Sequence, residues 1–341
     1  MPSVSLNVKS RISNVIKKFK FEDLESAVLP CFPELSWEQI KAKLVKNHDS
    51  LTTPHALRII EEEIAKKKLS ESILKTRLAT LEVIDVSIHY KRKVWYTYEF
   101  KSRNENRDNP ENMSLEEIED KIMQSFDVYQ MEMEVQAVEH EDIVFLSIKD
   151  KPKKKKIKNI LPTYFSLIMN ENFFFCSKKL VMKNILMAVV EGMGYKSCKL
   201  VKLTGRDIPS LVQMLLTKKE NGTVKAPLPF RPAAPVSTSL GLDFTQHKQR
   251  EEYVDKCFGE NPPTFEALKV KSLDQKWIDE EAAEKLPDEV IFTGVEFRSQ
   301  SIPNFLKNLV TQKVLTTPLP CYAANILQLG RNDFTVKENH S

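Results

Sequence analysis

The sequence of residues 131–148 is MEMEVQAVEHEDIVFLSI, and here the apolar residues change from helical spacing to alternation. Alternation with a period of two is typical of strands whose two faces differ in burial. Two further apolar segments follow before residue 180, separated by a short polar turn. We therefore expect an antiparallel meander of four strands, at 131–138, 142–148, 163–169 and 173–177.

Helical patterns flank these strands on both sides. Ser114-Leu115-Glu116-Glu117 has the spacing of a capping box, which predicts a helix start just before the first strand. A helix over 180–190, a strand over 198–203 and a helix over 208–216 are expected after the fourth strand, and Asp207 would cap the last helix. The region 91–217 is thus predicted to be α+β, with its helices packed on one face of the sheet.

Residues 1–90 predict a small all-helical domain. Apolar residues recur at helical spacing in five short segments, and helix starts are indicated by Ser36 with Gln39, by Thr53-Pro54 and by Ser70. Brief turns between short helices predict a compact bundle. The segment 91–100, in which basic residues stand beside aromatic ones, is expected to join this bundle to the next domain or to flank nucleic acid.

The region 218–238 carries four prolines within nine residues and predicts an extended linker. Beyond it, residues 239–341 form a further α+β region. We expect a helix near 245–257, a strand at 290–297, a helix at 302–310 and a strand at 333–337. Because this region offers few apolar residues for a core of its own, we expect a partner subunit to complete its sheet.

Charge is segregated along the chain. Residues 151–206 carry 13 Lys and Arg against 2 acids, whereas 101–150 carry 5 basic and 14 acidic residues, and the whole chain is only +4. Such segregation favours a polyanionic partner, most often nucleic acid. The densest run lies between the second and third expected strands and includes Lys153, Lys154, Lys155 and Lys156. It fits a solvated loop, a nuclear import signal or a phosphate-contacting loop.

The remaining basic residues of this stretch fall at a helix start and along a strand and turn. They are Lys178, Lys179, Lys183, Lys196, Lys199, Lys202 and Arg206. If they share one face, they form a wall along a duplex backbone, and each neutralised phosphate steepens the log–log salt dependence by about 0.9. Because no helix has the pattern of a base reader, we expect sequence-independent binding.

Signatures of catalysis and metal binding are missing from the sequence. It contains no G-x-x-x-x-G-K-[ST], G-x-S-x-G or H-E-x-x-H motif, and its five cysteines form no C-x-x-C pair. We therefore expect a protein that is not an enzyme, with no catalytic residue, metal or cofactor. No apolar run reaches about 18 residues and no secretory signal is evident, so no membrane association is expected.

Short motifs follow one another along nearly the whole chain. They are Lys93-Val94-Trp95 after the helical region, Pro162-Thr163-Tyr164 after the basic loop, Leu200-Val201-Lys202 before Arg206, Ser239-Leu240-Gly241-Leu242-Asp243 before a charged helix, Cys257-Phe258-Gly259, and a late strand at 294–297. In this order they resemble the centromere protein N family of inner-kinetochore subunits. The ordered set is more specific than any one motif.

The resemblance implies a pyrin-like helical domain over 1–90, an α+β domain shared with centromere protein L over 91–217, and a C-terminal region for dimerisation with centromere protein L over 239–341. It implies a nuclear protein of the centromere and kinetochore, active in chromosome segregation. Its partners would be the nucleosome that contains the histone variant centromere protein A, and the inner-kinetochore subunits centromere proteins H, I, K and M.

The resemblance also implies a set of DNA contacts. By position these are the basic loop before Pro162 and Lys18, Lys46, Lys93, Lys183 and Arg206. The family reads the histone variant partly through acids near the start of its first helix, but this chain has no Asp or Glu before Glu22, so we assign no histone-reading residue. Two alternatives stay open: a general nucleic-acid-binding scaffold, and a pyrin-type signalling adaptor.

Overall fold

The computed structural model describes residues 3–67, 69–103, 113–151, 161–220, 244–276, 280–285 and 290–336. They form an α+β protein with two compact units. The first unit contains residues 1–90 and 98–199, and the second contains 91–97 and 200–341. The chain passes between the units three times, once in a 3-10 turn (Tyr90–Arg92) and twice within strands, and each unit is described by itself. Of the expected linker, only residues 218–220 are described, and they are helical.

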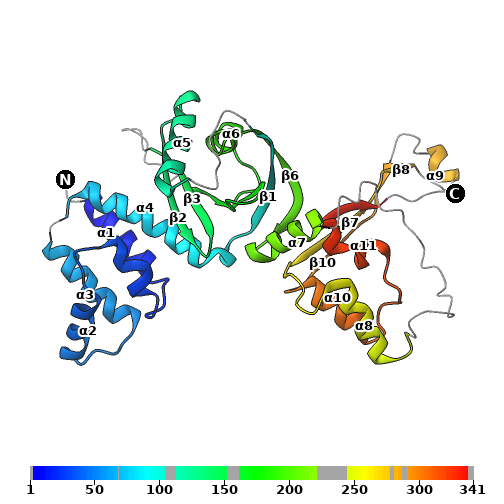
Figure 1. The fold of residues 1–341 in the computed structure, drawn as a ribbon, viewed down its shortest axis with the longest axis horizontal. Helices are drawn as coiled ribbons and strands as arrows, with labels where there is room; N and C mark the ends of the chain where they lie inside the picture. The colour runs from blue at the N-terminus through cyan, green and yellow to red at the C-terminus, as the bar shows by residue number, and fades with distance from the viewer. Residues whose placement is uncertain are drawn as a thin grey trace. The chain divides into compact units, whose positions relative to one another are not determined.

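The first unit begins with a helical bundle whose apolar faces meet in one core (Figure 1). Its helices are α1 (Ser3–Ile16), α2 (Trp37–Lys46), α3 (Thr53–Lys66) and α4 (Glu71–Ile88). The second of the five expected helices, over residues 21–29, is instead a π-helical turn (Leu24–Val28) followed by a 3-10 turn (Leu29–Cys31). Pro30 lies within the 3-10 turn and lacks the amide hydrogen that a continuing α-helix needs, so no α-helix extends through it.

Of the helix caps predicted at Ser70, Ser114 and Ser36, the first two are confirmed and the third is wrong. The hydroxyl of Ser70 accepts a hydrogen bond from the amide of Ile73, at 3.3 Å, as expected. The capping box at Ser114 is complete, since its hydroxyl accepts from the amide of Glu117 while Glu117 accepts from the amide of Ser114. The predicted box at Ser36 is wrong, because its side chain makes no capping hydrogen bond. Trp37 packs there against Phe21 instead, with ring centroids 5.2 Å apart.

A six-stranded sheet follows, with the order β2-β3-β4-β5-β1-β6. Its strands are β1 (Trp95–Arg103), β2 (Met133–His140), β3 (Ile143–Asp150), β4 (Thr163–Leu167), β5 (Phe173–Cys176) and β6 (Tyr195–Gly205). The predicted antiparallel meander of four strands is confirmed by β2 to β5. Strand β1 was expected only as a connection, but its aromatic residues place it inside the sheet, between β5 and β6.

Both faces of this sheet are covered, and a helix of the bundle takes part in covering it, which the sequence did not predict. Every residue of β4 and β5 is buried, and alternate residues of a strand point to opposite faces. Helix α4 packs on β2 and β3, while α5 (Leu115–Val128) packs on β2 and on α6 (Lys183–Gly192). A Cβ at Gly192 would lie 2.7 Å from the Ile122 side chain, so glycine permits the close approach of α5 and α6.

The second unit contains a three-stranded sheet of order β10-β7-β11 (Figure 1). Strand β7 (Ala267–Ser272) pairs antiparallel with β10 (Gly294–Arg298) and parallel with β11 (Asp333–Val336). Its longer helices are α7 (Ile208–Glu220), α8 (His247–Phe258) and α10 (Ile302–Thr311). Small elements complete it, namely β8 (Gln275–Lys276), α9 (Glu280–Lys285), β9 (Val290–Ile291), α11 (Cys321–Ala324) and α12 (Ile326–Leu329).

Candidate nucleic-acid interface

The lysine run leaves from one end of the six-stranded sheet. In the strand registers, Met133 faces Asp150, Ile148 faces Thr163 and Phe165 faces Cys176. The starts of β2 and β4 and the ends of β3 and β5 therefore share this end. The run connects two inner strands, β3 and β4, as the sequence predicts. Lys153, Lys154, Lys155 and Lys156 themselves lie outside the described residues.

The loop after β5 is tied to the start of β4 at the same end of the sheet. The ammonium of Lys178 donates to the carbonyl of Leu161, at 3.1 Å, and to the hydroxyl of Thr163, at 2.9 Å. The backbone amides of Ser177 and Tyr164 each donate to the other residue. Lys178 therefore braces the loop. Lys179 and Lys183, which follow it, are exposed to solvent.

Two ion pairs, one from α1 and one from the turn after it to α4, lie near Tyr164, the second residue of β4. Burial raises the pKa of Tyr164, and the carboxylates of Glu82 and Asp85 raise it further. The guanidinium of Arg11 is 2.6 Å from Glu82, and the ammonium of Lys18 is 2.5 Å from Asp85.

Lys18 therefore has an internal partner. It lies in the turn after α1 rather than in the helix, and the Asp85 side chain that it neutralises is only 11% exposed. Asp85 also lies 3.0 Å from the ring nitrogen Nδ1 of His89. Because Lys18 compensates a buried carboxylate, its removal would disturb the bundle as well as any phosphate contact.

The acids near Tyr164 of β4, Glu82 and Asp85, are both paired with cations of the bundle. Asp150 and Glu132 lie beside β2 and β3, at the exit of the lysine run. The side formed by β4, the loop after β5 and the start of α6 carries Lys178, Lys179 and Lys183, and residues 172–190 contain no Asp or Glu. A phosphate backbone would therefore be attracted to the β4–β5 side.

Lys46 and Lys183 belong to the same unit but to different elements. Lys46 is the last residue of α2 and is exposed, and α2 packs on α3 within the bundle. Lys183 is the first residue of α6, which packs on α5. Neither is among the residues brought together by the bonds around Lys178.

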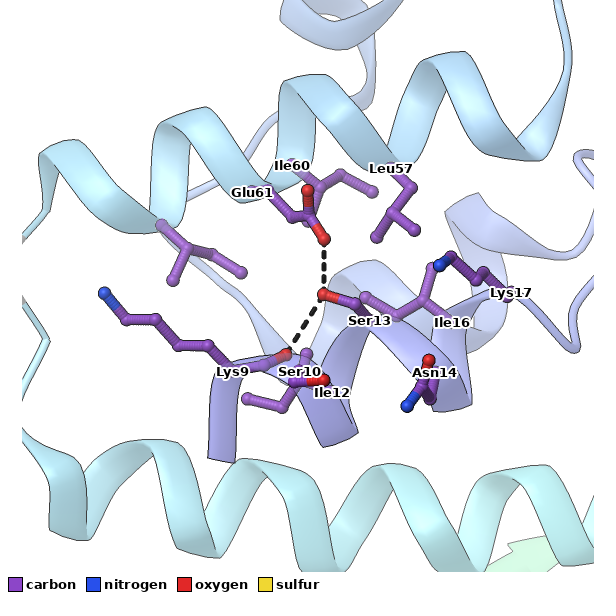
Figure 2. Close-up of a pocket in the computed structure, with 11 residues that line it drawn as sticks. Lys9, Ser10, Ile12, Ser13, Asn14, Ile16, Lys17, Leu57, Ile60 and Glu61 are labelled. Carbon is purple, nitrogen blue, oxygen red and sulfur yellow. Dashed lines mark hydrogen bonds between the residues drawn. The ribbon is translucent and has the colours of Figure 1, made fainter. Parts of the chain in front are cut away.

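A groove between α1 and α3 opens on the exposed face of α1, with a volume of about 360 Å³ (Figure 2). Ile12, Ile16 and Ile60 lie in its floor, and Lys9 and Lys17 extend at its two ends. The hydroxyl of Ser13 lies within hydrogen-bond distance of two acceptors, the carbonyl of Lys9 and the carboxylate of Glu61 in α3. Among the described residues that line the groove, Glu61 is the one acid. A search of the first helix for acids could not find it, because α3 contributes it.

The lysines of β6 do not share one face. Burial alternates along Val201, Lys202 and Leu203, so Lys202 points away from the buried side. Lys199 stands three residues earlier, and an odd spacing reverses the side of a strand on which a residue lies. A single wall along a duplex requires that these residues share a face. Lys199 and Lys202 therefore do not meet this condition.

In the second unit, Lys202 and Arg206 are exposed and lie four residues apart. Arg206 Nε is 3.0 Å from Glu266, and both side chains are nearly half exposed. Exposed ion pairs contribute less than about 1 kcal/mol, so a phosphate can replace Glu266 as the partner of Arg206. Lys93 is half-buried and already has a partner within the protein.

Asp207 caps α7 as predicted. Its carboxylate accepts from the amide of Ser210, at 3.2 Å, and lies 2.9 Å from the ammonium of Lys91. Burial alone would raise the pKa of Asp207, but the bonds from Ser210 and Lys91 outweigh it and lower the pKa. The charge of this cap therefore persists at neutral pH, and it holds the basic segment 91–93 beside the start of α7.

Asn332 closes the free edge of β6, a role that sequence reasoning missed. It is only 3% exposed, and its side chain accepts from the amide of Thr204, at 3.1 Å, and donates to the carbonyl of Thr204. Its backbone amide donates to the carbonyl of Lys202, and its carbonyl accepts from the amide of Lys269 in β7. No local pattern distinguishes this asparagine from a turn residue, so only the fold reveals it.

The described residues contain no group of three or more His, Cys, Asp or Glu side chains placed to hold a metal ion. Burial raises the pKa of the Cys176 thiol to about 12, so this thiol stays protonated at neutral pH and is a poor nucleophile. In the part of the chain that the structure describes, no helix is long and apolar enough to cross a bilayer. Comparison with known family models and with curated proteins found no match to this chain.

Proposed function

We propose that the protein is a non-enzymatic kinetochore adaptor of the centromere protein N family, which binds the centromeric nucleosome mainly through its DNA backbone. The observation that supports this most strongly is the exposure of Lys179 and Lys183, which follow the loop that Lys178 ties to β4, at the end of the sheet from which the lysine run emerges. Ammonium groups without a base-reading helix suit phosphates, which are the same in every sequence.

Within this proposal, the α1–α4 bundle is the pyrin-like domain, and it carries Lys18 and Lys46 to the DNA. The adaptor acts in the nucleus, at the centromere. Its DNA contacts hold the nucleosome with centromere protein A, while its other surfaces join the remaining inner-kinetochore subunits.

Charge reversal tests the DNA contacts. A variant with Lys183→Glu, Lys202→Glu and Arg206→Glu should bind nucleosomes far more weakly at low salt, and its salt slope should fall by roughly 0.9 for each phosphate that is no longer neutralised. The matched control reverses three other exposed lysines of the described chain, Lys248, Lys256 and Lys313, and should bind like the parent. Equal affinity of the two variants in a gel-shift titration would refute the interface.

Strand β10 supports the second part of the proposal, which is pairing with a centromere protein L-like subunit. All five of its residues are exposed, and Val295 and Phe297 project from one side of it. An exposed edge strand with apolar side chains offers hydrogen bonds and side-chain contacts to an added strand. Val295→Glu with Phe297→Glu should abolish co-elution with the co-expressed partner. Co-elution of this variant would remove β10 from the interface.

A general nucleic-acid-binding scaffold is the second candidate function. It is favoured by the same lysines, because contacts to phosphates cannot distinguish one histone from another. It differs from the first proposal in predicting equal affinity for centromeric and ordinary nucleosomes.

A further inference from the structure

The loop between β5 and α6 holds apolar side chains out into solvent. Leu180 is 88% exposed, the highest value among the large hydrophobic side chains of the described residues. Met182, two residues later, is 63% exposed, and Leu161, whose carbonyl binds Lys178, is 77% exposed. Clusters of exposed apolar side chains on an otherwise polar surface mark interaction sites more often than single exposed residues do.

Flexibility of the loop does not account for this exposure. Lys178 bonds Leu161 and Thr163, and the amides of Ser177 and Tyr164 each bond the other residue, so the base of the loop is fixed to β4. Leu180 stands two residues beyond this bracing, and α6 begins three residues after it. The two apolar side chains are therefore displayed between two anchored points.

The charges around these side chains limit the chemical classes of partner that could bind there. Lys179 and Lys183 are exposed on either side of Leu180 and Met182, and the nearest acids in sequence are Glu171 and Glu191. Asp150 ends β3 and Glu132 precedes β2 at the same end of the sheet, while the acids near Tyr164 of β4 are paired with cations of the bundle. A fitting partner is therefore anionic at its rim and accepts an aliphatic side chain at its centre.

A DNA base step offers both features. Phosphates line the two sides of the minor groove, and several DNA-bending proteins insert a Leu, Ile or Met between base pairs there, partly unstacking them. A lipid surface is also anionic, but stable anchoring needs a larger apolar face, usually with aromatic residues at headgroup level. Residues 177–183 contain no aromatic side chain.

We propose that Leu180, supported by Met182, is a wedge that enters the minor groove and opens a base step, while Lys179 and Lys183 hold the flanking phosphates. This inference rests on the proposed DNA-binding function and adds to it that the bound duplex is bent. It also assigns affinity to an apolar contact, which salt does not screen.

The test uses the full chain and a duplex of about 20 base pairs with a donor and an acceptor dye at its ends, since a kink of tens of degrees shortens the distance between them. The variant combines Leu180→Ser and Met182→Ser, and the control combines Val128→Ser and Val314→Ser, which are 77% and 64% exposed. The parent and the control should raise energy transfer on binding. The wedge variant should lose that rise and bind about tenfold more weakly, with an unchanged salt slope.

Three results would overturn the wedge. If the parent binds without bending and the variant binds equally well, the wedge is refuted while the DNA-binding function stands. If the parent does not bind the duplex at low salt, both the wedge and the proposed function are wrong. If the variant keeps its duplex binding but loses binding to phosphatidylserine vesicles, the loop contacts a lipid surface.

Discussion

The six-stranded sheet and the three-stranded sheet differ in how far their outer strands are covered. Both outer strands of the larger sheet are capped by side chains from elsewhere in the fold. At β2, the carboxylate of Glu119 accepts from the amide of Ala137 and from the side chain of Gln136. At β6, Asn332 bonds Thr204 and Lys202. Strand β10 of the smaller sheet is instead exposed along its whole length.

The contrast indicates which surface is built to receive another chain. An uncovered edge strand invites pairing with a second strand, and natural proteins usually block such edges unless they use them. We therefore propose that the capped sheet is a scaffold that displays cations at its end, and that the open sheet receives a partner. Phenylalanine has different surroundings in the two sheets, since Phe165 is fully buried and Phe297 is 39% exposed.

Replacing Phe165 or Phe297 with alanine gives the largest expected difference in the free energy of unfolding. Phe165→Ala removes a fully buried ring and should lower the free energy of unfolding by about 3–5 kcal/mol. Phe297→Ala should change it by less than about 1 kcal/mol in the isolated chain, because its ring already lies partly in solvent. Urea denaturation of both variants measures the difference. Equal losses of stability would mean that β10 is already covered and that the comparison of the sheets fails.

Removing the cap of β6 should have the next largest effect. Asn332→Ala removes the partner of the half-buried amide and carbonyl of Thr204, at a cost of about 1–3 kcal/mol. Asn304, an exposed asparagine of α10, provides the control Asn304→Ala, which should leave stability unchanged. The midpoint of urea denaturation reports both variants. If Asn332→Ala behaves like its control, the edge of β6 is not sealed by this side chain.

The smallest effect concerns the cap of β2 and depends on pH. Burial raises the pKa of Glu119, against the bonds from Ala137 and Gln136 that lower it. A carboxyl whose pKa is raised by folding stabilises the fold when protonated, below its unfolded pKa. This contribution is lost as the pH rises through the folded pKa.

Replacing Glu119 with glutamine should therefore stabilise the fold at neutral pH only. Glu119→Gln keeps an oxygen that accepts from Ala137, so a slightly higher unfolding temperature is expected at pH 7, with little change near pH 4. Glu139→Gln, at an exposed position of β2, should show no such difference between the two pH values. A destabilised Glu119→Gln variant at pH 7 would show that the ionised form seals the edge.

The sequence predicted the strongly periodic elements well. Strands β2 to β5 alternate clearly or are uniformly apolar, so their positions and the site of the lysine run between β3 and β4 followed from the pattern alone. Strand β1 was missed because its aromatic residues stand beside Lys91, Arg92 and Lys93, which suggested a connection. Strand β7, with the sequence ALKVKS, was missed because its lysines conceal the alternation of a half-covered strand.

The site was less predictable than the fold, for a physical reason. Local sequence shows which residues are charged, but ion pairs join residues that are distant in sequence, such as Lys18 with Asp85 and Arg206 with Glu266. The bracing role of Lys178, the acid that Glu61 contributes to the face of α1, and the bonds of Asn332 arise in the same way. Each depends on tertiary contacts that no spacing rule encodes.

The most direct test of the proposed function is a competition experiment with the full chain bound to a labelled nucleosome that contains centromere protein A. Unlabelled competitors would be the same nucleosome, an ordinary nucleosome and the free DNA, at one fixed salt concentration because phosphate contacts depend steeply on salt. The proposal predicts that the centromeric nucleosome competes at the lowest concentration. Equal competition by the two nucleosomes would contradict it and leave a general nucleic-acid-binding scaffold.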